Sequence, residues 1–204
     1  MGAIDGEYLA KLEDILDLYA QPSDPSRPRI CIDEHPCQHL GDLIAPVPVK
    51  PGKATKQDYE YERNGTACVL LAYHLETGQR YTQVLPRRTK ADYARFVATA
   101  IEHLCPTATR VRRIQDNLNT HTAGAFYQAF DATTARRLMQ RLEFHSTPTH
   151  ASWLNMAELE FSALVRQCFD RRIGSLELLA HEVAGRTHQA RAPLPASSCY
   201  ELSC

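Results

Sequence analysis

The order of its apolar segments is the feature that most constrains how this chain can fold. Short runs rich in β-branched residues, which are typical of strands, alternate with longer segments whose apolar residues recur at helical spacing. The expected strands are 29–34, the two arms of a hairpin within 66–86, 110–115 and 142–147. The expected helices are 1–20, 89–105, 122–130, 135–142, 154–169 and 175–190. This order predicts an α/β fold with strands running in both directions.

The length of 204 residues suggests one domain and an appendage. The first twenty residues form an amphipathic pattern, and QPSDPSRP, with three prolines in eight residues, then breaks it. We therefore separate residues 1–28, a linker helix and a Pro-rich linker, from a domain over 29–190. The stretch 191–204 (RAPLPASSCYELSC) lacks apolar periodicity, so we expect it to be a disordered, atypical tail.

Charge and cysteine usage exclude several classes of protein. The formal net charge is -1 with 23% charged residues, so any attraction to nucleic acid must come from local clusters. Seven cysteines occur without a CxxC pair, which fits neither a disulfide framework nor a zinc ribbon. The acidic N-terminus is not a secretory signal, and no apolar run is long enough to span a membrane. We expect a cytoplasmic protein.

Two aspartates follow expected strands directly. Asp33 comes after RICI, and Asp116 comes after RVRRIQ. In open α/β sheets, functional groups gather just past the carboxyl ends of strands, so the two carboxylates are candidates for a shared site. The ordinary explanation of each is structural, because aspartate favours turns and helix starts.

The helix expected over 154–169 places a carboxylate where packing does not explain it. At about 100° per residue, Glu158 falls within the apolar face near its edge, whereas Glu160 falls on a solvated flank. The ordinary explanation is that Glu158 reaches outward or pairs with an arginine. The functional one is that it joins Asp33 and Asp116, because three carboxylates without histidine or thiolate partners suit magnesium or manganese. Such sites hold two ions and support in-line displacement at phosphorus.

At these residues the chain resembles the catalytic domain of DDE transposases of the mariner-like superfamily, and within it the bacterial insertion-sequence family numbered six-thirty. The resemblance covers most of the chain from about Arg29 to Ile173. The stretches that carry it are CIDEHP, DYEYERNGT, TGQRY, QDNLNTH and HASWLNMAELEFS.

The resemblance implies an RNase H-like fold, a mixed five-stranded sheet flanked by helices, over residues 29–190. It implies that Asp33, Asp116 and Glu158 are the catalytic residues and bind two Mg²⁺ or Mn²⁺ ions. The implied activity is DNA strand cleavage and strand transfer at insertion-sequence ends. The implied partners are transposon ends, target DNA and a second copy of the full-length chain, in a bacterial cytoplasm and on its nucleoid.

Further residues are weaker candidates. Asn117, His121 and Asn155 could orient a ligand carboxylate or a phosphate, although His121 could equally make a helix-start hydrogen bond. Basic residues of the long expected loop 36–66 and of the hairpin end could hold DNA phosphates, although charge pairs are usually just solvated. They are Lys50, Lys53, Lys56, Arg87 and Arg88. We expect Trp153 to be a packing anchor rather than a base-stacking residue.

Two departures from the family pattern support an alternative. Relatives carry a helix-turn-helix region before this domain, whereas only about 28 residues precede the first expected strand here. The final stretch also lacks the basic, aromatic ending of the family. The chain could therefore be a truncated, non-catalytic remnant of a transposase that acts as a DNA-binding or dimerising fragment.

Overall fold

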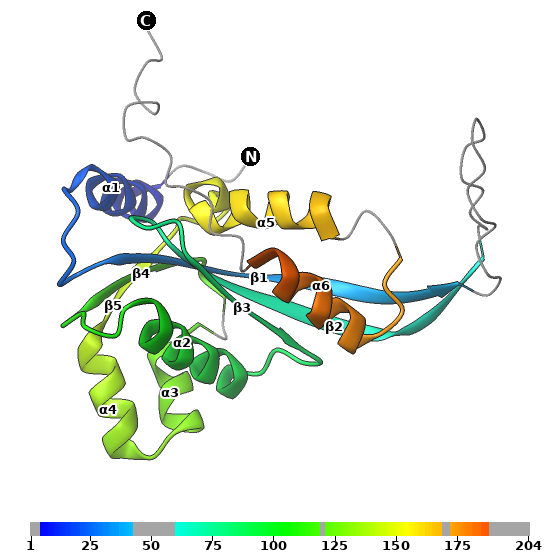
Figure 1. The fold of residues 1–204 in the computed structure, drawn as a ribbon. Helices are drawn as coiled ribbons and strands as arrows, with labels where there is room; N and C mark the ends of the chain where they lie inside the picture. Colours follow the sequence, from blue (N-terminus) through cyan, green and yellow to red (C-terminus); the bar gives the residue numbers. More distant parts are fainter. Residues whose placement is uncertain (1–4, 43–59, 119–120, 169–171, 188–204) are drawn as a thin grey trace, which may run out of the picture.

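The structure, a computed structural model, describes residues 5–42, 60–118, 121–168 and 172–187, and places a mixed sheet between two layers of helices (Figure 1). Its five strands lie in the order β3-β2-β1-β4-β5, which confirms the predicted fold class. The strands are β1 (Arg29–Asp42), β2 (Tyr61–His74), β3 (Arg80–Leu85), β4 (Val111–Gln115) and β5 (Leu142–Ser146). The helices are α1 (Gly6–Ala20), α2 (Lys90–Leu104), α3 (Ala123–Ala129), α4 (Ala132–Arg141), α5 (Met156–Cys168) and α6 (Leu176–Thr187), with a 3-10 turn η1 (Ser152–Leu154).

The central strand β1 pairs antiparallel with β2 on one side and parallel with β4 on the other. Strands β2 and β3 form the expected antiparallel hairpin, and β4 pairs parallel with β5. The parallel pairs bring the carboxyl ends of β4 and β5 to the part of β1 that follows Cys31, which pairs with Ile114. This edge of the sheet is therefore where groups from three strands can meet.

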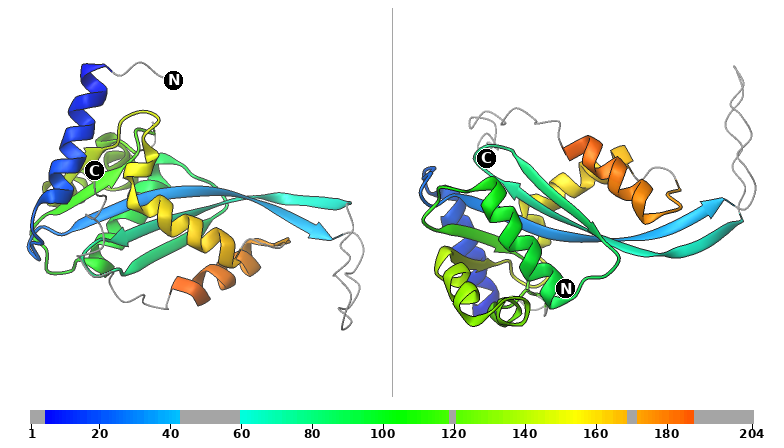
Figure 2. Two further views of the ribbon diagram at one scale, coloured as in Figure 1. Left: turned by 90° about the horizontal axis from the view of Figure 1, so that it is seen from above. Right: turned by 60° about the horizontal axis from the view of Figure 1, so that its bottom comes forward.

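The strands β1 and β2 are longer than the sequence predicted. We expected a loop over 36–66, but β1 continues to Asp42 and β2 begins at Tyr61, so the prediction is wrong for both ends of that segment. The two strands form a ribbon that projects beyond the rest of the sheet (Figures 1 and 2). Past Cys31 the β4 side of β1 is an edge, where Pro36 is tolerated.

The ribbon contains one irregularity. Its register shifts between His39 and Leu40. Gly65, the partner of His39, has a φ of 122°, a backbone conformation that L side chains rarely adopt. Beyond the shift, the Leu40 amide donates to the carbonyl of Ile173 (3.1 Å), between α5 and α6.

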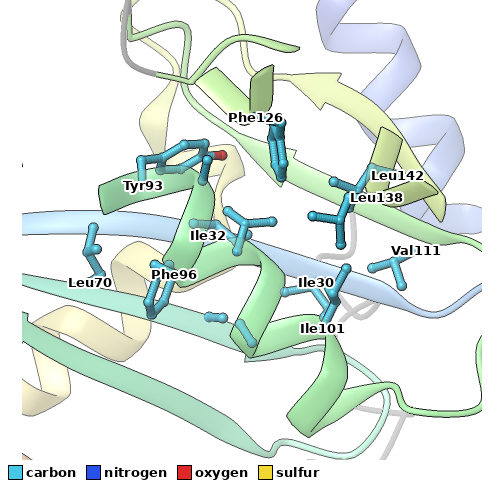
Figure 3. Packing of buried hydrophobic residues seen from close by; sticks show 14 of the residues in the cluster. Ile30, Ile32, Leu70, Tyr93, Phe96, Ile101, Val111, Phe126, Leu138 and Leu142 are labelled. Atoms are coloured by element: carbon cyan, nitrogen blue, oxygen red, sulfur yellow. The ribbon is translucent and has the colours of Figure 1, made fainter. Parts of the chain in front are cut away.

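Alternate residues of β1 enter two different cores. Ile30 and Ile32 pack with Tyr93 and Phe96 of α2 and with side chains of α3 and α4 on one face of the sheet (Figure 3). Cys31 packs on the opposite face with residues of α1, α5 and α6. This alternation of period two is what a strand covered on both faces requires.

Two local predictions can be checked directly at helices. Thr89 is the N-cap of α2, as predicted. It forms a reciprocal capping box with Asp92. The amphipathic N-terminal segment is helical as α1, with Ile15 and Leu18 buried against the sheet. The Tyr19 hydroxyl donates a hydrogen bond to the carbonyl of Leu154 (2.6 Å), so α1 is fastened to the turn that precedes α5.

Within the described residues, no helix combines the length and apolarity that crossing a membrane would require.

Candidate active site

The parallel pairing of β1 and β4 brings Asp33 and Asp116 to the same level of the sheet. Each residue lies two positions beyond the paired residues Cys31 and Ile114. Asp116 follows the end of β4, as predicted, whereas Asp33 lies within β1, because β1 continues along β2. The expected strand end at Asp33 is therefore wrong, but the side chain still lies where the parallel pair ends.

A cleft of about 470 Å³ lies between β1 and α5, next to Asp33. Glu158, in the first turn of α5, is exposed and lies on the other wall of this cleft. The residues that line the cleft are Asp33, Glu34, His35, Glu158, Phe161, Ser162, Val165 and Arg166.

The electrostatics of Asp33 show that the three predicted carboxylates are close enough to interact. Burial raises the pKa of Asp33 to about 7, and the negative charges of Asp116 and Glu158 act in the same direction. The amide of Glu34 opposes the shift by donating to Asp33 Oδ1 (2.8 Å), and so does the charge of His121. In the absence of a cation, Asp33 therefore keeps a proton more readily than an ordinary aspartate.

The three carboxylates suit a divalent cation, although they do not yet lie close enough together to coordinate one. Among the described residues, no three side chains of His, Cys, Asp or Glu already lie together at metal-ligand distances. Carboxylate oxygens are nevertheless the ligands that Mg²⁺ and Mn²⁺ prefer, and a cation between them would remove the repulsion that contributes to the raised pKa of Asp33. Asp33, Asp116 and Glu158 are the residues that could hold it.

The orientation of α5 corrects the predicted environments of its two glutamates. Glu158 is exposed towards the cleft, whereas Glu160 forms an ion pair with Arg80 of β3, in which each side chain is 11% exposed. The helical periodicity predicts a solvated flank for Glu160 and the core-facing side for Glu158. The periodicity located the apolar stripe correctly at Leu154 and Phe161, both buried. It could not show that Arg80 of β3 reaches Glu160 on one flank of the helix and that the cleft opens along the other.

Asn155 fastens the start of α5 to β1 and is 1% exposed. Its Nδ2 donates to the carbonyl of Ile32 (2.9 Å), directly before Asp33, and its Oδ1 accepts from the amide of Ala157 (3.2 Å). Asn155 therefore holds the first turn of α5, and with it Glu158, next to Asp33. Asn117 lies in the loop after β4, where its Nδ2 donates to the carbonyl of Thr147 (3.3 Å).

On the α2 face, the structure gathers three residues that we call the Glu34 cluster: Glu34, Arg88 and His121. Glu34 Oε1 accepts from Arg88 Nη1 (2.5 Å), and Glu34 Oε2 lies 3.7 Å from His121 Nε2. The other ring nitrogen of His121, Nδ1, lies 2.7 Å from Asp116 Oδ1. The cluster therefore connects the first strand of the site to the loop after β4.

The charges of the Glu34 cluster stabilise one another. Burial works to lower the pKa of His121, but Asp116 and Glu34 outweigh it, and the pKa is raised. Burial works to raise the pKa of Glu34, but His121 and Arg88 outweigh it, and the pKa is lowered. The sequence analysis did not single out Glu34. The available signal was strand alternation, which places Glu34 on the opposite face from Asp33 and requires a partner for its charge there.

The remaining candidates have varied environments. Arg88 is bonded to Glu34, and Arg87 is exposed. Trp153 is 64% exposed, so the expectation of a packing anchor is wrong; the adjacent Leu154 is the buried residue of η1. Lys50, Lys53 and Lys56 and the tail 191–204 lie outside the described residues.

Comparison with known proteins identifies the fold and the family. The chain is similar to structures of a Mos1 transposase paired-end complex with the left transposon end (15% identity, TM-score 0.63) and a Mos1 mariner paired-end complex with Mn (16%, 0.64). It also resembles a Mos1 strand transfer complex (16%, 0.62). The likeness covers 94%, 94% and 90% of this chain but only 58%, 58% and 54% of the Mos1 chains.

At these identities the likeness shows the fold alone, which is RNase H-like. No curated protein sequence matches the chain. The sequence profile of DDE superfamily endonucleases matches residues 28–180, which include Asp33, Asp116 and Glu158. The chain therefore belongs to the family of DDE superfamily endonucleases.

Proposed function

We propose that this chain is the catalytic domain of a DNA transposase, which cleaves DNA strands at the ends of an insertion sequence and transfers them to target DNA. Membership of an endonuclease family supports the hydrolytic step. The observation that carries the proposal is the gathering of Asp33, Asp116 and Glu158 at one edge of the sheet, next to a cleft.

On this proposal, Asp33, Asp116 and Glu158 hold Mg²⁺ or Mn²⁺, with two ions in the complete site. The ions, when bound, supply activation of the attacking oxygen and stabilisation of the leaving oxygen at phosphorus. Asp33 would hold a cation as the carboxylate, so binding would compete with the proton that burial and neighbouring negative charge favour by raising its pKa to about 7. Asn155 keeps Glu158 next to Asp33 through its bond to the carbonyl of Ile32.

DNA is the proposed partner. Arg166 lines the same cleft as Glu158, farther along α5, and is suited to a DNA phosphate, and the exposed Arg87 could hold another. Binding by such contacts depends on phosphate charge, so it should be weak in sequence preference and should fall steeply with salt. In its full-length form the protein would act as a homodimer on paired ends, in a bacterial cytoplasm and on its nucleoid.

The test is metal-dependent nicking of supercoiled plasmid DNA. The wild-type chain should nick with Mg²⁺ or Mn²⁺ and not with EDTA, and Glu158→Gln should lower the rate by about 10²–10³-fold. Glu177→Gln is the matched control, because Glu177 is likewise an exposed glutamate in the first turn of a helix, α6, away from the cleft lining. It should nick as the wild type does.

Three outcomes would contradict the proposal or part of it. A folded wild-type chain that does not nick with either metal would support the non-catalytic alternative. Normal nicking by Glu158→Gln would place the third carboxylate elsewhere. Equal losses in Glu158→Gln and Glu177→Gln would mean that the effect lies in the helix starts, where both carboxylates interact with helix dipoles, and not in the site.

A further inference from the structure

Glu34 and His121 of the Glu34 cluster are buried next to the proposed metal ligands, yet the proposed mechanism does not use them. We propose that Glu34, acting through His121, is a positioning residue that fixes the carboxylate of Asp116 and so sets the affinity of the site for its divalent cation. The inference rests on the proposed function for the role of Asp116, but the positioning itself can be tested without metal.

The imidazole of His121 is held in one plane. Its ring stacks on Tyr93 of α2 with a centroid distance of 4.2 Å and an interplanar angle of 26°. The backbone carbonyl of His121 accepts a hydrogen bond from Gln115 Nε2 (2.9 Å), and the Tyr93 hydroxyl donates a hydrogen bond to Gln115 Oε1. The side chain is 1% exposed, so the ring has little room to move out of this plane.

The direction of the ring within its plane depends on what faces its two nitrogens. Nε2 faces Glu34 Oε2 at 3.7 Å, and Nδ1 faces Asp116 Oδ1 at 2.7 Å. Glu34 itself is held at its other oxygen by Arg88 and is 3% exposed. Within the described part of the chain, Glu34 Oε2 makes no hydrogen bond, so His121 is the group that compensates its burial.

This arrangement leaves Asp116 with one oxygen engaged and one available. His121 contacts Oδ1, and the amide of Leu118 also approaches Oδ1 at 3.4 Å. The Asp116 side chain is 34% exposed, so its second oxygen can accept a cation. Groups that hold a metal ligand in this way reduce the number of orientations lost when the metal binds, and their loss typically costs about 10–100-fold in metal affinity.

A purely structural role and a direct electrostatic role make different predictions for position 34. If Glu34 only supplied negative charge, Glu34→Gln would behave like Glu34→Ala; if it only filled space, Glu34→Met, which has no oxygen to face the ring, would bind the cation as the wild type does. If it positions His121, Glu34→Gln keeps its oxygen for Arg88 and turns its NH2 to an unprotonated Nε2, so that Nδ1–H still faces Asp116 and metal affinity should be retained. Position 121 offers a second distinction: the His121→Asn amide lies near Nδ1, towards Asp116, whereas the His121→Gln amide lies near Nε2, towards Glu34.

The experiment measures the Mn²⁺ dissociation constant of the full chain by electron paramagnetic resonance, with thermal unfolding as a check of folding. Glu34→Ala should bind Mn²⁺ about 10–100-fold more weakly than the wild type, while Glu34→Gln stays within about threefold. His121→Gln should lose affinity and His121→Asn should retain most of it. The double variant Glu34→Ala/His121→Gln should bind no more weakly than His121→Gln alone, because Glu34 acts through His121.

The control is Glu76→Ala, which removes a carboxylate that also contacts an arginine and a histidine, outside the cleft. It should leave Mn²⁺ affinity unchanged. Equal weakening in Glu34→Ala and Glu76→Ala, or additive losses in the double variant, would overturn the inference. Glu34→Met, which keeps the length of the side chain without its oxygens, should weaken Mn²⁺ binding as Glu34→Ala does, and it decides the question if Glu34→Ala does not fold.

A metal-free crystal structure of Glu34→Ala separates this inference from the proposed function. Asp116 should leave His121 Nδ1 or occupy more than one conformer. A single conformer that still lies 2.7 Å from Nδ1 would show that Glu34 does not position it. If the wild-type chain binds no Mn²⁺, the proposed metal site is wrong, and this distance alone decides whether Glu34 positions Asp116.

Discussion

Strand β1 carries one residue of each of two clusters with the same composition, an arginine, a glutamate and a histidine. The Glu34 cluster lies beside the candidate active site. The other, which we call the Glu76 cluster, consists of Arg29, His74 and Glu76, around the β2–β3 hairpin. Arg29 Nε lies 2.7 Å from Glu76 Oε1, and His74 Nδ1 lies 3.3 Å from Glu76 Oε2.

The two histidines are in opposite protonation environments. His74 Nδ1 accepts a hydrogen bond from the amide of Thr77 (3.3 Å), so this nitrogen carries no proton. Burial accordingly lowers the pKa of His74, although Glu76 opposes the shift. His121 instead faces a carboxylate at each nitrogen, and its pKa is raised. The same three residue types thus accompany a lowered histidine pKa in one cluster and a raised one in the other.

The two arginines differ in the same sense. Arg29, with a side chain that is 11% exposed, also donates to backbone carbonyls at the end of α1. The Arg88 side chain is 52% exposed and bonds Glu34. The contacts of the Glu76 cluster join β1, the hairpin and the end of α1, whereas the Glu34 cluster ends on Asp116, at the proposed site. The comparison teaches that two buried charge networks of the same composition differ in whether they reach an accessible carboxylate.

The largest expected difference between the clusters lies in their arginines. Arg29→Met should lower the free energy of unfolding by about 3–5 kcal/mol, because it leaves Glu76 buried without its cation. Arg88→Met should lower it by about 1 kcal/mol or less, because Arg88 is half exposed and Glu34 keeps His121. Urea unfolding at pH 7.5 measures both. Equal losses would mean that the Glu34 cluster is as structural as the other.

The second-largest effect concerns Asp33, whose negative charge in β1 should oppose folding. The pKa of Asp33 is raised from 3.8 to about 7, so its contribution to stability is full below pH 3.8 and is lost as the pH rises through 7. Without metal, Asp33→Asn should therefore raise the free energy of unfolding at pH 8 by about 1–3 kcal/mol, with a smaller gain at pH 5. Glu76→Gln should lower it at pH 8. A gain that does not change with pH would show that the charge of Asp33 is not the cause.

The smallest effect concerns His74. Its pKa is lowered, so its contribution to stability is full above the unfolded value of 6.5 and is lost as the pH falls through the folded value. His74→Asn can still accept from the amide of Thr77 but does not take up a proton. Its free energy of unfolding should fall less than that of the wild type between pH 7 and pH 5, by about 1 kcal/mol at most. Chemical unfolding measures both free energies. If they change with pH in parallel for the wild type and His74→Asn, the protonation of His74 in the Glu76 cluster does not contribute to the pH dependence of stability.

Local patterns predicted the parts of the fold that local interactions determine. The Thr89 cap of α2 and the hairpin around Gly78, whose φ is 69°, follow from residues within a few positions of one another. The positions of Asp33 and Asp116 at one edge followed from the order of strands and helices. These predictions needed no knowledge of long-range contacts.

The predictions that failed depend on segments far apart in the sequence. The length of β1 depends on its pairing with β2, which continues as far as Asp42 and Tyr61. The environment of Glu160 depends on Arg80 of β3, and that of Glu34, for which we made no prediction, depends on Arg88, 54 residues later. Helical and strand periodicity states which side of an element a residue occupies. It does not state which other element covers that side.

The irregularity between His39 and Leu40 separates the outer ribbon from the part of β1 that carries Asp33. His39 pairs with Gly65 and Leu40 with Arg63, so Asn64 of β2 is an extra residue, and such a residue bends a strand pair and increases its twist. Asp33, which pairs with Leu71, lies six residues before the shift, where the pairing is regular. Beyond the shift, the Leu40 amide joins the outer ribbon to Ile173, between α5 and α6. The direction of the outer ribbon is thus set separately from the backbone at the aspartate.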